Sequence, residues 1–239
     1  MLSSLDLAMF FLRLLSFLFF FNTLVASDAL AISPEELFEK AQTLEDNGFL
    51  EEATKSWEEL TTVDTNLNFV IYAQLKLGIT YLKLKQFEKS IDILKTTTVS
   101  HPDNFDAHFS LANSLSAFKN FPKAIKSYKK TITLKPKEAL SYVGLGLSLF
   151  GNGDSESAIK ALLKANKSFK EKKNISWHRD TRVMIAQVKH FEKFPPHFSN
   201  LWLATNLKLV HDTYEKAVFN QKQYLASIST HEKNDSPIK

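Results

Sequence analysis

The chain has 239 residues, of which 44 % are hydrophobic and 23 % are charged, and its formal net charge is +4. These proportions are ordinary for a folded soluble domain. The chain has no cysteine, which excludes disulfide bonds, thiolate metal sites, cysteine nucleophiles and the acylated cysteine of a bacterial lipoprotein.

The N-terminal segment has the character of a leader. Residues 5–26 are strongly apolar and are interrupted by Arg13, and Ala29-Leu30-Ala31 follows them. This A-x-A pattern is typical of a signal-peptidase site, so residues 1–31 are predicted to form a cleaved signal peptide. An uncleaved anchor remains the alternative, because about 20 apolar residues can span a bilayer. Either reading places the rest of the chain on the far side of a membrane, in a periplasm or a thylakoid lumen.

The central part of the chain is repetitive. Residues 105–138 contain two segments, 107–118 and 121–134, in which inward-facing residues recur at spacings of three and four. This spacing predicts a hairpin of two amphipathic helices. One such hairpin is too small to bury a core alone and must stack on copies of itself. Four copies are found in register, at residues 34–67, 71–104, 105–138 and 139–172.

Small residues mark the places where helices should approach closely. Gly78 and Gly146 occupy the same repeat position as Ala41 and Ala112. We expect the larger side chains of the second helices to fill the space beside them: Trp57, Leu94, Tyr128 and Leu162.

The repeat pattern combines a Leu-Gly pair, an alanine with a large residue four positions later, and a closing proline such as Pro102 or Pro136. This pattern resembles the tetratricopeptide repeat. The resemblance implies an all-α fold, a right-handed superhelical solenoid of helical hairpins whose task is to bind other proteins.

Helical periodicity continues after the last repeat. Residues 173–194 carry an apolar stripe and are predicted to form the helix that caps the array. After Pro195-Pro196, residues 199–228 are predicted to form a longer amphipathic helix, and residues 229–239 a disordered tail. Two roles are open for the longer helix: a lid or built-in ligand in the groove of the array, or an extension of the solenoid end.

The resemblance also implies a binding groove. In tetratricopeptide arrays the first helices of successive hairpins line a concave groove that holds an extended peptide or a partner helix. Carried over to this sequence, the protein-binding groove consists of Phe38, Gln42, Tyr72, Leu75, Ile79, Leu82, Phe109, Asn113, Leu140, Val143, Leu147 and Phe150. Asn113 is the candidate to hydrogen-bond a peptide backbone, because its amide both donates and accepts. The first, third and fourth helices of this groove lack cations, so no carboxylate clamp of the chaperone type is expected.

Residue patterns that carry chemistry are missing. No two of the seven histidines are three or four residues apart, and no phosphate-binding glycine loop or nucleophile elbow is present. We therefore expect no enzyme activity, no cofactor and no metal. Beyond the leader only Arg179 and Arg182 are arginines, and with an export signal this argues against nucleic-acid binding.

Charge is distributed unevenly. Residues 34–67 contain ten acidic residues and two lysines, a balance of −8, whereas residues 105–239 contain 22 basic and eleven acidic residues, a balance of +11. Solvated helix faces that carry charges of opposite sign would explain this pattern. A basic half that contacts an anionic partner or membrane surface would also explain it.

The sequence as a whole predicts a non-enzymatic scaffold that binds a protein or peptide client and assists assembly or maintenance of membrane or envelope complexes. A more specific alternative is a photosystem I assembly factor of the tetratricopeptide type, as in cyanobacteria and plastids. Another is a module that binds a membrane surface through its basic C-terminal half. Residues 5–26 add a possible membrane association.

Overall fold

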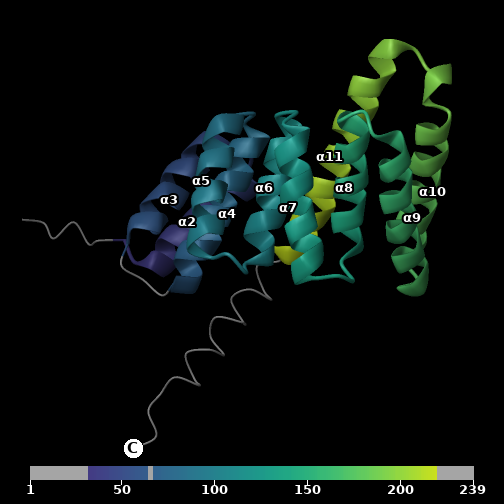
Figure 1. Ribbon diagram of the computed structural model, residues 1–239. Coiled ribbons are helices and arrows are strands. Elements are labelled where there is room, and N and C mark those ends of the chain that lie inside the picture. The colour runs from purple at the N-terminus through teal and green to yellow at the C-terminus, as the bar shows by residue number, and fades with distance from the viewer. Residues whose placement is uncertain (1–31, 64–66, 220–239) are drawn as a thin grey trace, which may run out of the picture. The chain divides into compact units, whose positions relative to one another are not determined.

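The fold is all-helical, as predicted. The computed structural model describes residues 32–63 and 67–219, and within these ranges it contains ten α-helices, one 3-10 helix and no strand (Figure 1). The predicted leader, residues 1–31, and the predicted tail, residues 229–239, lie outside the described residues. No helix in the described ranges is long and apolar enough to cross a membrane. The described residues from Leu37 to Phe219 belong to one unit, and the tertiary contacts below lie within it; Ser33 and Glu36 precede this unit.

Consecutive helices pair into hairpins along the array. The pairs are α2 (Pro34–Asp46) with α3 (Leu50–Thr62), α4 (Leu67–Lys83) with α5 (Phe87–Ser100), α6 (Phe105–Ala117) with α7 (Phe121–Leu134), and α8 (Ala139–Gly151) with α9 (Ser155–Glu171). From α3 to α9 each helix packs on the next one in the chain. This neighbour-to-neighbour packing is how a repeat array builds one continuous core.

Local sequence signals explain where several helices begin. The Ser33 hydroxyl accepts a hydrogen bond from the backbone N–H of Glu36, and the Glu36 carboxylate accepts one from the N–H of Ser33. This reciprocal capping box fixes the start of α2. Asp154 accepts from the N–H of Ser157 at 2.9 Å and so caps α9.

The second repeat begins earlier than the 34-residue period suggests. Its first helix, α4, starts at Leu67 rather than at residue 71. Residues 68–70, which interrupt the period in the sequence, add a turn to this helix. Apolar packing explains this earlier start, because Phe69 is buried with its ring centroid 5.8 Å from that of Phe38.

Two glycines confirm the predicted close approaches within hairpins. A Cβ atom added to Gly78 would lie 2.5 Å from a Leu94 carbon, and one added to Gly146 would lie 2.8 Å from Leu162. A larger residue at either position would require the facing leucine or its helix to shift.

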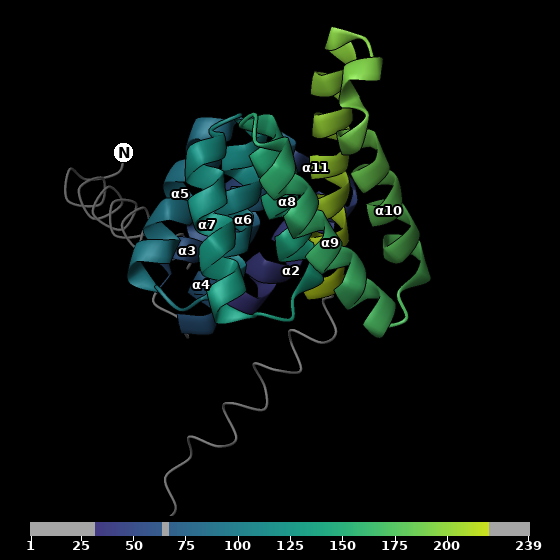
Figure 2. The ribbon, with the colours of Figure 1, turned by 45° about the vertical axis from the view of Figure 1, so that its right-hand side comes forward.

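The last two helices run in different directions along the array. Helix α10 (Ile175–Lys189) packs on α9, with Phe169 and Trp177 stacked at 5.4 Å between ring centroids. After a 3-10 turn (Phe191–Lys193), helix α11 (Pro196–Val218) turns back and lies beside α8 and α6 (Figures 1 and 2). The long amphipathic helix was predicted over residues 199–228; it begins three residues earlier because proline suits a first helical turn. Residues 220–228 lie outside the described residues.

Candidate protein-binding groove

The first helices of the repeats, α4, α6 and α8, face α11. Three aromatic contacts join them in reverse chain order. Trp202 meets Phe150 of α8 at 5.1 Å between ring centroids, Tyr214 stacks on Phe109 of α6 at 3.9 Å, and Phe219, just after α11, meets Tyr72 of α4 at 5.3 Å. Helix α11 therefore covers this face of the array along most of its length.

A charged cluster anchors the C-terminal end of α11 to α4. Glu215 accepts from Lys83 at 2.6 Å and lies 3.4 Å from the Lys76 amine. Glu45 of α2 contacts the same two lysines, at 2.7 Å from Lys83 and 2.8 Å from Lys76. Lys76 and Glu45 are almost fully buried. Two cations and two anions balance here, and this balance is what makes their burial tolerable.

The cluster shifts the pKa values of its members. Burial alone would raise the pKa of Glu215, but Lys76 and Lys83 outweigh it and hold that pKa below its ordinary value. Burial alone would lower the pKa of Lys83, yet Glu45 and Glu215 raise it. Both shifts favour the charged forms, so the pairing between α4 and α11 is electrostatic at neutral pH.

A neighbouring histidine on α11 behaves differently. His211 is buried, and burial lowers its pKa below the ordinary value of 6.5, with Glu215 offsetting only part of this effect. Its Nε2 atom is 3.8 Å from the Glu215 carboxylate, which is too long for a hydrogen bond. At neutral pH His211 is therefore mainly uncharged while α11 is in place.

Two tyrosines complete the polar contacts of the groove. The Tyr214 hydroxyl donates to the carboxylate of Asp106 on α6. The pKa of Tyr214 is raised well above the ordinary value, mainly by burial and further by the Asp106 carboxylate. The Tyr128 hydroxyl donates to Asn113 Oδ1 at 2.6 Å and is fully buried.

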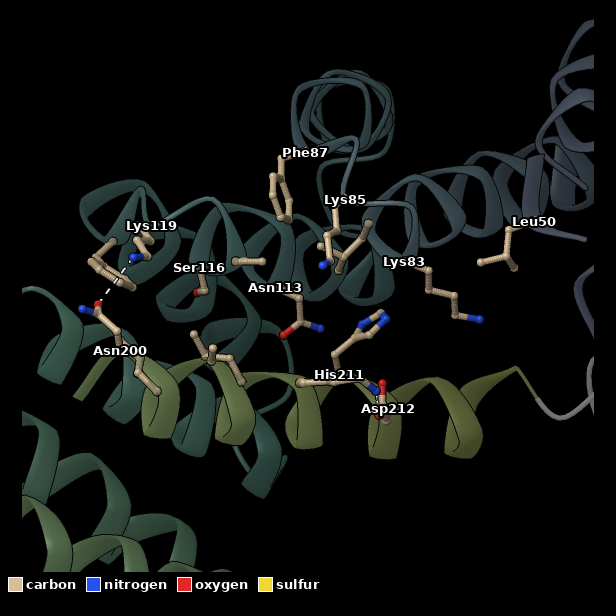
Figure 3. Close-up of a pocket in the computed structure, with 17 residues that line it drawn as sticks. Leu50, Lys83, Lys85, Phe87, Asn113, Ser116, Lys119, Asn200, His211 and Asp212 are labelled. Atoms are coloured by element: carbon tan, nitrogen blue, oxygen red, sulfur yellow. Dashed lines mark hydrogen bonds and ion pairs between the residues drawn. The ribbon is translucent and has the colours of Figure 1, made fainter. Parts of the chain in front are cut away.

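A cavity of about 520 Å³ remains between α11 and the ends of α4, α6 and α7. Figure 3 shows α11 forming one wall of this cavity and the array the other. Its apolar lining includes Leu82, Phe87, Phe121, Leu203 and Leu207.

The predicted groove residues separate into three groups. Tyr72, Phe109 and Phe150 contact aromatic residues of α11 or Phe219, and Leu82 and Asn113 line the cavity. The remaining side chains are buried among the helices: Phe38, Gln42, Leu75, Ile79, Leu140, Val143 and Leu147. Of these, Phe38 packs against Trp57 and Tyr72, so it belongs to the hydrophobic core.

The apolar pattern did not reveal Lys76 and Lys83 as groove residues. They lie seven positions apart on α4, a spacing that places two side chains on one helical face, and both contact Glu215. That spacing was the only sequence feature that could have indicated them, and a search for apolar positions on α4 passes over it. In the described part of the chain no group of three or more His, Asp or Glu residues is placed to hold a metal ion.

Comparison with known proteins agrees with this geometry. A family model described as "Tetratricopeptide repeat" matches residues 75–139 and 112–169. A search of curated proteins finds no match.

Solved structures titled as MamA share the fold. "Crystal structure of MamA protein" is 26 % identical, with 61 % of this chain and 78 % of that chain covered and a TM-score of 0.54. "Crystal structure of MamA" is 25 % identical, with 64 % and 86 % covered and a TM-score of 0.55. A MamA fragment from Desulfovibrio magneticus RS-1 is 19 % identical, covers 80 % of this chain and all of its own, and has a TM-score of 0.56; this last likeness concerns the fold alone. The stacked hairpins and the family match together show that the chain contains tetratricopeptide repeats over residues 75–169.

Proposed function

We propose that this protein is a non-enzymatic scaffold that binds a protein client on the face formed by α4, α6 and α8. One observation carries the proposal: that face already holds an amphipathic helix, α11, through aromatic contacts and ion pairs. A surface that binds a helix from its own chain has the shape and chemistry to bind a similar helix from a partner.

Helix α11 then acts as a built-in ligand that a client displaces. Its course supports this role over that of an end extension. It runs back from α8 to α4, so that Trp202 lies near the fourth repeat and Glu215 near the second. A helix that only extended the array would pack beyond α10 and would leave the charged pair Lys76 and Lys83 without Glu215.

The test compares two full-length variants of α11. Glu215→Lys places a third cation beside Lys76 and Lys83 and should release the helix, whereas Asp212→Lys, three residues earlier, removes an ion pair that lies within α11 itself. Client candidates are captured from solubilised membranes and then measured with purified components. We expect the Glu215→Lys protein to bind the client more tightly than the Asp212→Lys protein. Equal binding by both variants would show that the client uses another surface.

We further propose that the scaffold works on the far side of a membrane and assists assembly or maintenance of membrane or envelope complexes, with photosystem I assembly as the more specific form. The support is the apolar stretch of residues 5–26 and the Ala29-Leu30-Ala31 site. N-terminal sequencing of the mature protein should give Ile32 as the first residue. A mature protein that starts at Met1 or Met9 and resists alkaline extraction would instead carry an anchor.

A second candidate function, binding to a membrane surface, follows from the balance of +11 over residues 105–239. Such attraction is screened over a length of about 8 Å at physiological salt. The full chain should therefore sediment with vesicles that contain phosphatidylglycerol at low salt and be released at high salt. Failure to bind these vesicles at low salt would exclude this function.

A further inference from the structure

The cavity between α11 and the array is elongated and mostly apolar. On α11 its lining runs from Asn200 to Asp212, which is about 18 Å at a rise of 1.5 Å per residue. Its volume of about 520 Å³ lies inside the range of roughly 300 to 1,000 Å³ that is usual for small-molecule sites. An elongated, mostly apolar space favours a linear chain over a compact ring system.

Two buried nitrogen atoms at this cavity have no hydrogen-bond partner. Asn113 and His211 line it, and among the described residues neither the Asn113 Nδ2 nor the His211 Nε2 atom has a hydrogen-bond partner. The two side chains are only 4 % and 7 % exposed, so solvent does not readily satisfy them. Figure 3 shows the Asn113 amide nitrogen turned toward the imidazole of His211. Buried polar atoms left unpaired are costly, so an acceptor beside the Asn113 N–H would be bound favourably.

The charge around the cavity favours an anion. Lys83, Lys85, Lys119 and Lys208 line it together with a single acid, Asp212. Lys83 is balanced by Glu45 and Glu215, and Lys208 by Asp212. Lys119 donates to the neutral amide of Asn200 at the end of the cavity away from His211, so Lys85 is the cation that remains for a ligand near Asn113.

We propose that this cavity is a binding site for a linear alkyl carboxylate, with the chain along Phe121, Leu203 and Leu207 and the carboxylate at Asn113 and His211. The carboxylate accepts from the Asn113 N–H and from His211 in the tautomer that carries its hydrogen on Nε2, and Lys85 lies at the same side of the cavity. Because one wall belongs to α11 and the other to the array, a bound molecule holds the two together.

The test uses the full chain and dodecanoate below its micelle concentration, with binding measured by isothermal titration calorimetry. Dodecylamine has the same chain with the opposite charge, and methyl dodecanoate has the carbonyl without the charge, as an esterified lipid does. We expect dodecanoate to bind at least about tenfold more tightly than either, since hydrogen bonds to charged groups are the stronger ones. Absence of dodecanoate binding, or equal binding of the amine or the ester, would overturn the proposal.

Matched variants locate the site. Ala204 and Ala217 are both exposed on α11, but only Ala204 lines the cavity. Ala204→Phe should fill the cavity and weaken dodecanoate binding at least about tenfold, whereas Ala217→Phe should leave it unchanged. Similar affinities for the two variants would place the ligand elsewhere and refute the assignment.

The role of the buried donor has its own readout. Asn113→Asp keeps the oxygen that accepts from Tyr128 and replaces the free N–H donor with a second acceptor. It should weaken binding of dodecanoate by about tenfold and change binding of dodecanol little, because a carboxylate only accepts whereas the dodecanol hydroxyl can donate to the new acceptor. Equal losses for both molecules would indicate a structural effect and contradict the assigned role of Asn113.

Discussion

Glu215 offers the sharpest test of how α11 is held. The substitution Glu215→Gln keeps the size and an acceptor oxygen but removes the charge that pairs with Lys83 and Lys76. Breaking a buried ion pair costs roughly 3 to 5 kcal/mol. Glu45 still balances one of the two lysines, and a glutamine oxygen can still accept from Lys83. We therefore expect a loss of about 2 kcal/mol, below the range for a fully broken buried pair.

The loss should appear first as local detachment of α11. A change of about 2 kcal/mol corresponds to roughly a 30-fold increase in the opening equilibrium, at 1.4 kcal/mol per factor of ten. Amide hydrogen exchange over residues 200–218 measures that opening directly. If α11 and the array unfold together, the melting temperature should fall by about 4 to 8 °C, given the usual sensitivity of a domain of this size.

Asp212→Asn is the matched control. Asp212 pairs with Lys208 one turn away on α11 itself, and surface pairs of this kind contribute only about 0.3 to 0.5 kcal/mol. A double-mutant cycle with Lys83→Met should show that Glu215→Gln costs less when Lys83 is already absent. If Glu215→Gln and Asp212→Asn gave the same exchange rates over α11, the charged cluster would not be what holds the helix.

Three further predictions concern pH and packing. Because burial keeps the pKa of His211 below 6.5, the unfolded chain takes up a proton at higher pH than the folded one, and stability should fall as pH drops from about 6.5. Glu215, whose pKa lies below 4.5, stays charged down to that pH. His211→Gln should therefore flatten the dependence of stability on pH between about 4.5 and 6.5 in urea titrations, and an unaltered dependence would contradict the assignment. Gly144→Ala would put a Cβ atom 2.3 Å from the Tyr128 ring and should cost about 1 to 3 kcal/mol in chemical denaturation, with an unchanged midpoint as the contrary result. Tyr128→Phe leaves Asn113 Oδ1 without its donor and should cost about 1 to 3 kcal/mol in the same assay, and no loss would show that this hydrogen bond contributes nothing net.

The parts of the fold that the sequence predicted depend on short-range patterns. The contact of Gly78 with Leu94 follows from their fixed places in one hairpin, and the cap at Asp154 depends on a residue three positions away. Such relations repeat with the 34-residue period, and a single sequence displays the period several times. The fold class could therefore be inferred with few assumptions.

The groove was harder to predict because its contacts are distant in the sequence. Lys76 meets Glu45 and Glu215, and the latter bond joins residues 139 positions apart. Long-range ion pairs leave no periodic signal, and an apolar stripe selects Leu75 and Ile79 in preference to a buried lysine. The direction in which α11 leaves α10 is likewise set by the turn around Pro195 and by packing against α8, neither of which sequence periodicity records.

The tether between α10 and α11 has a consequence for any client. Because α11 belongs to the same chain and follows α10 after residues 190–195, its local concentration at the groove is fixed by the connection and does not fall on dilution. A client's apparent dissociation constant is raised by the inverse of the fraction of molecules whose groove is open. Apolar segments that bind weakly are therefore kept out of the groove at any protein concentration. The free energy with which the Glu215 cluster holds α11 sets the affinity that a client needs in order to displace it.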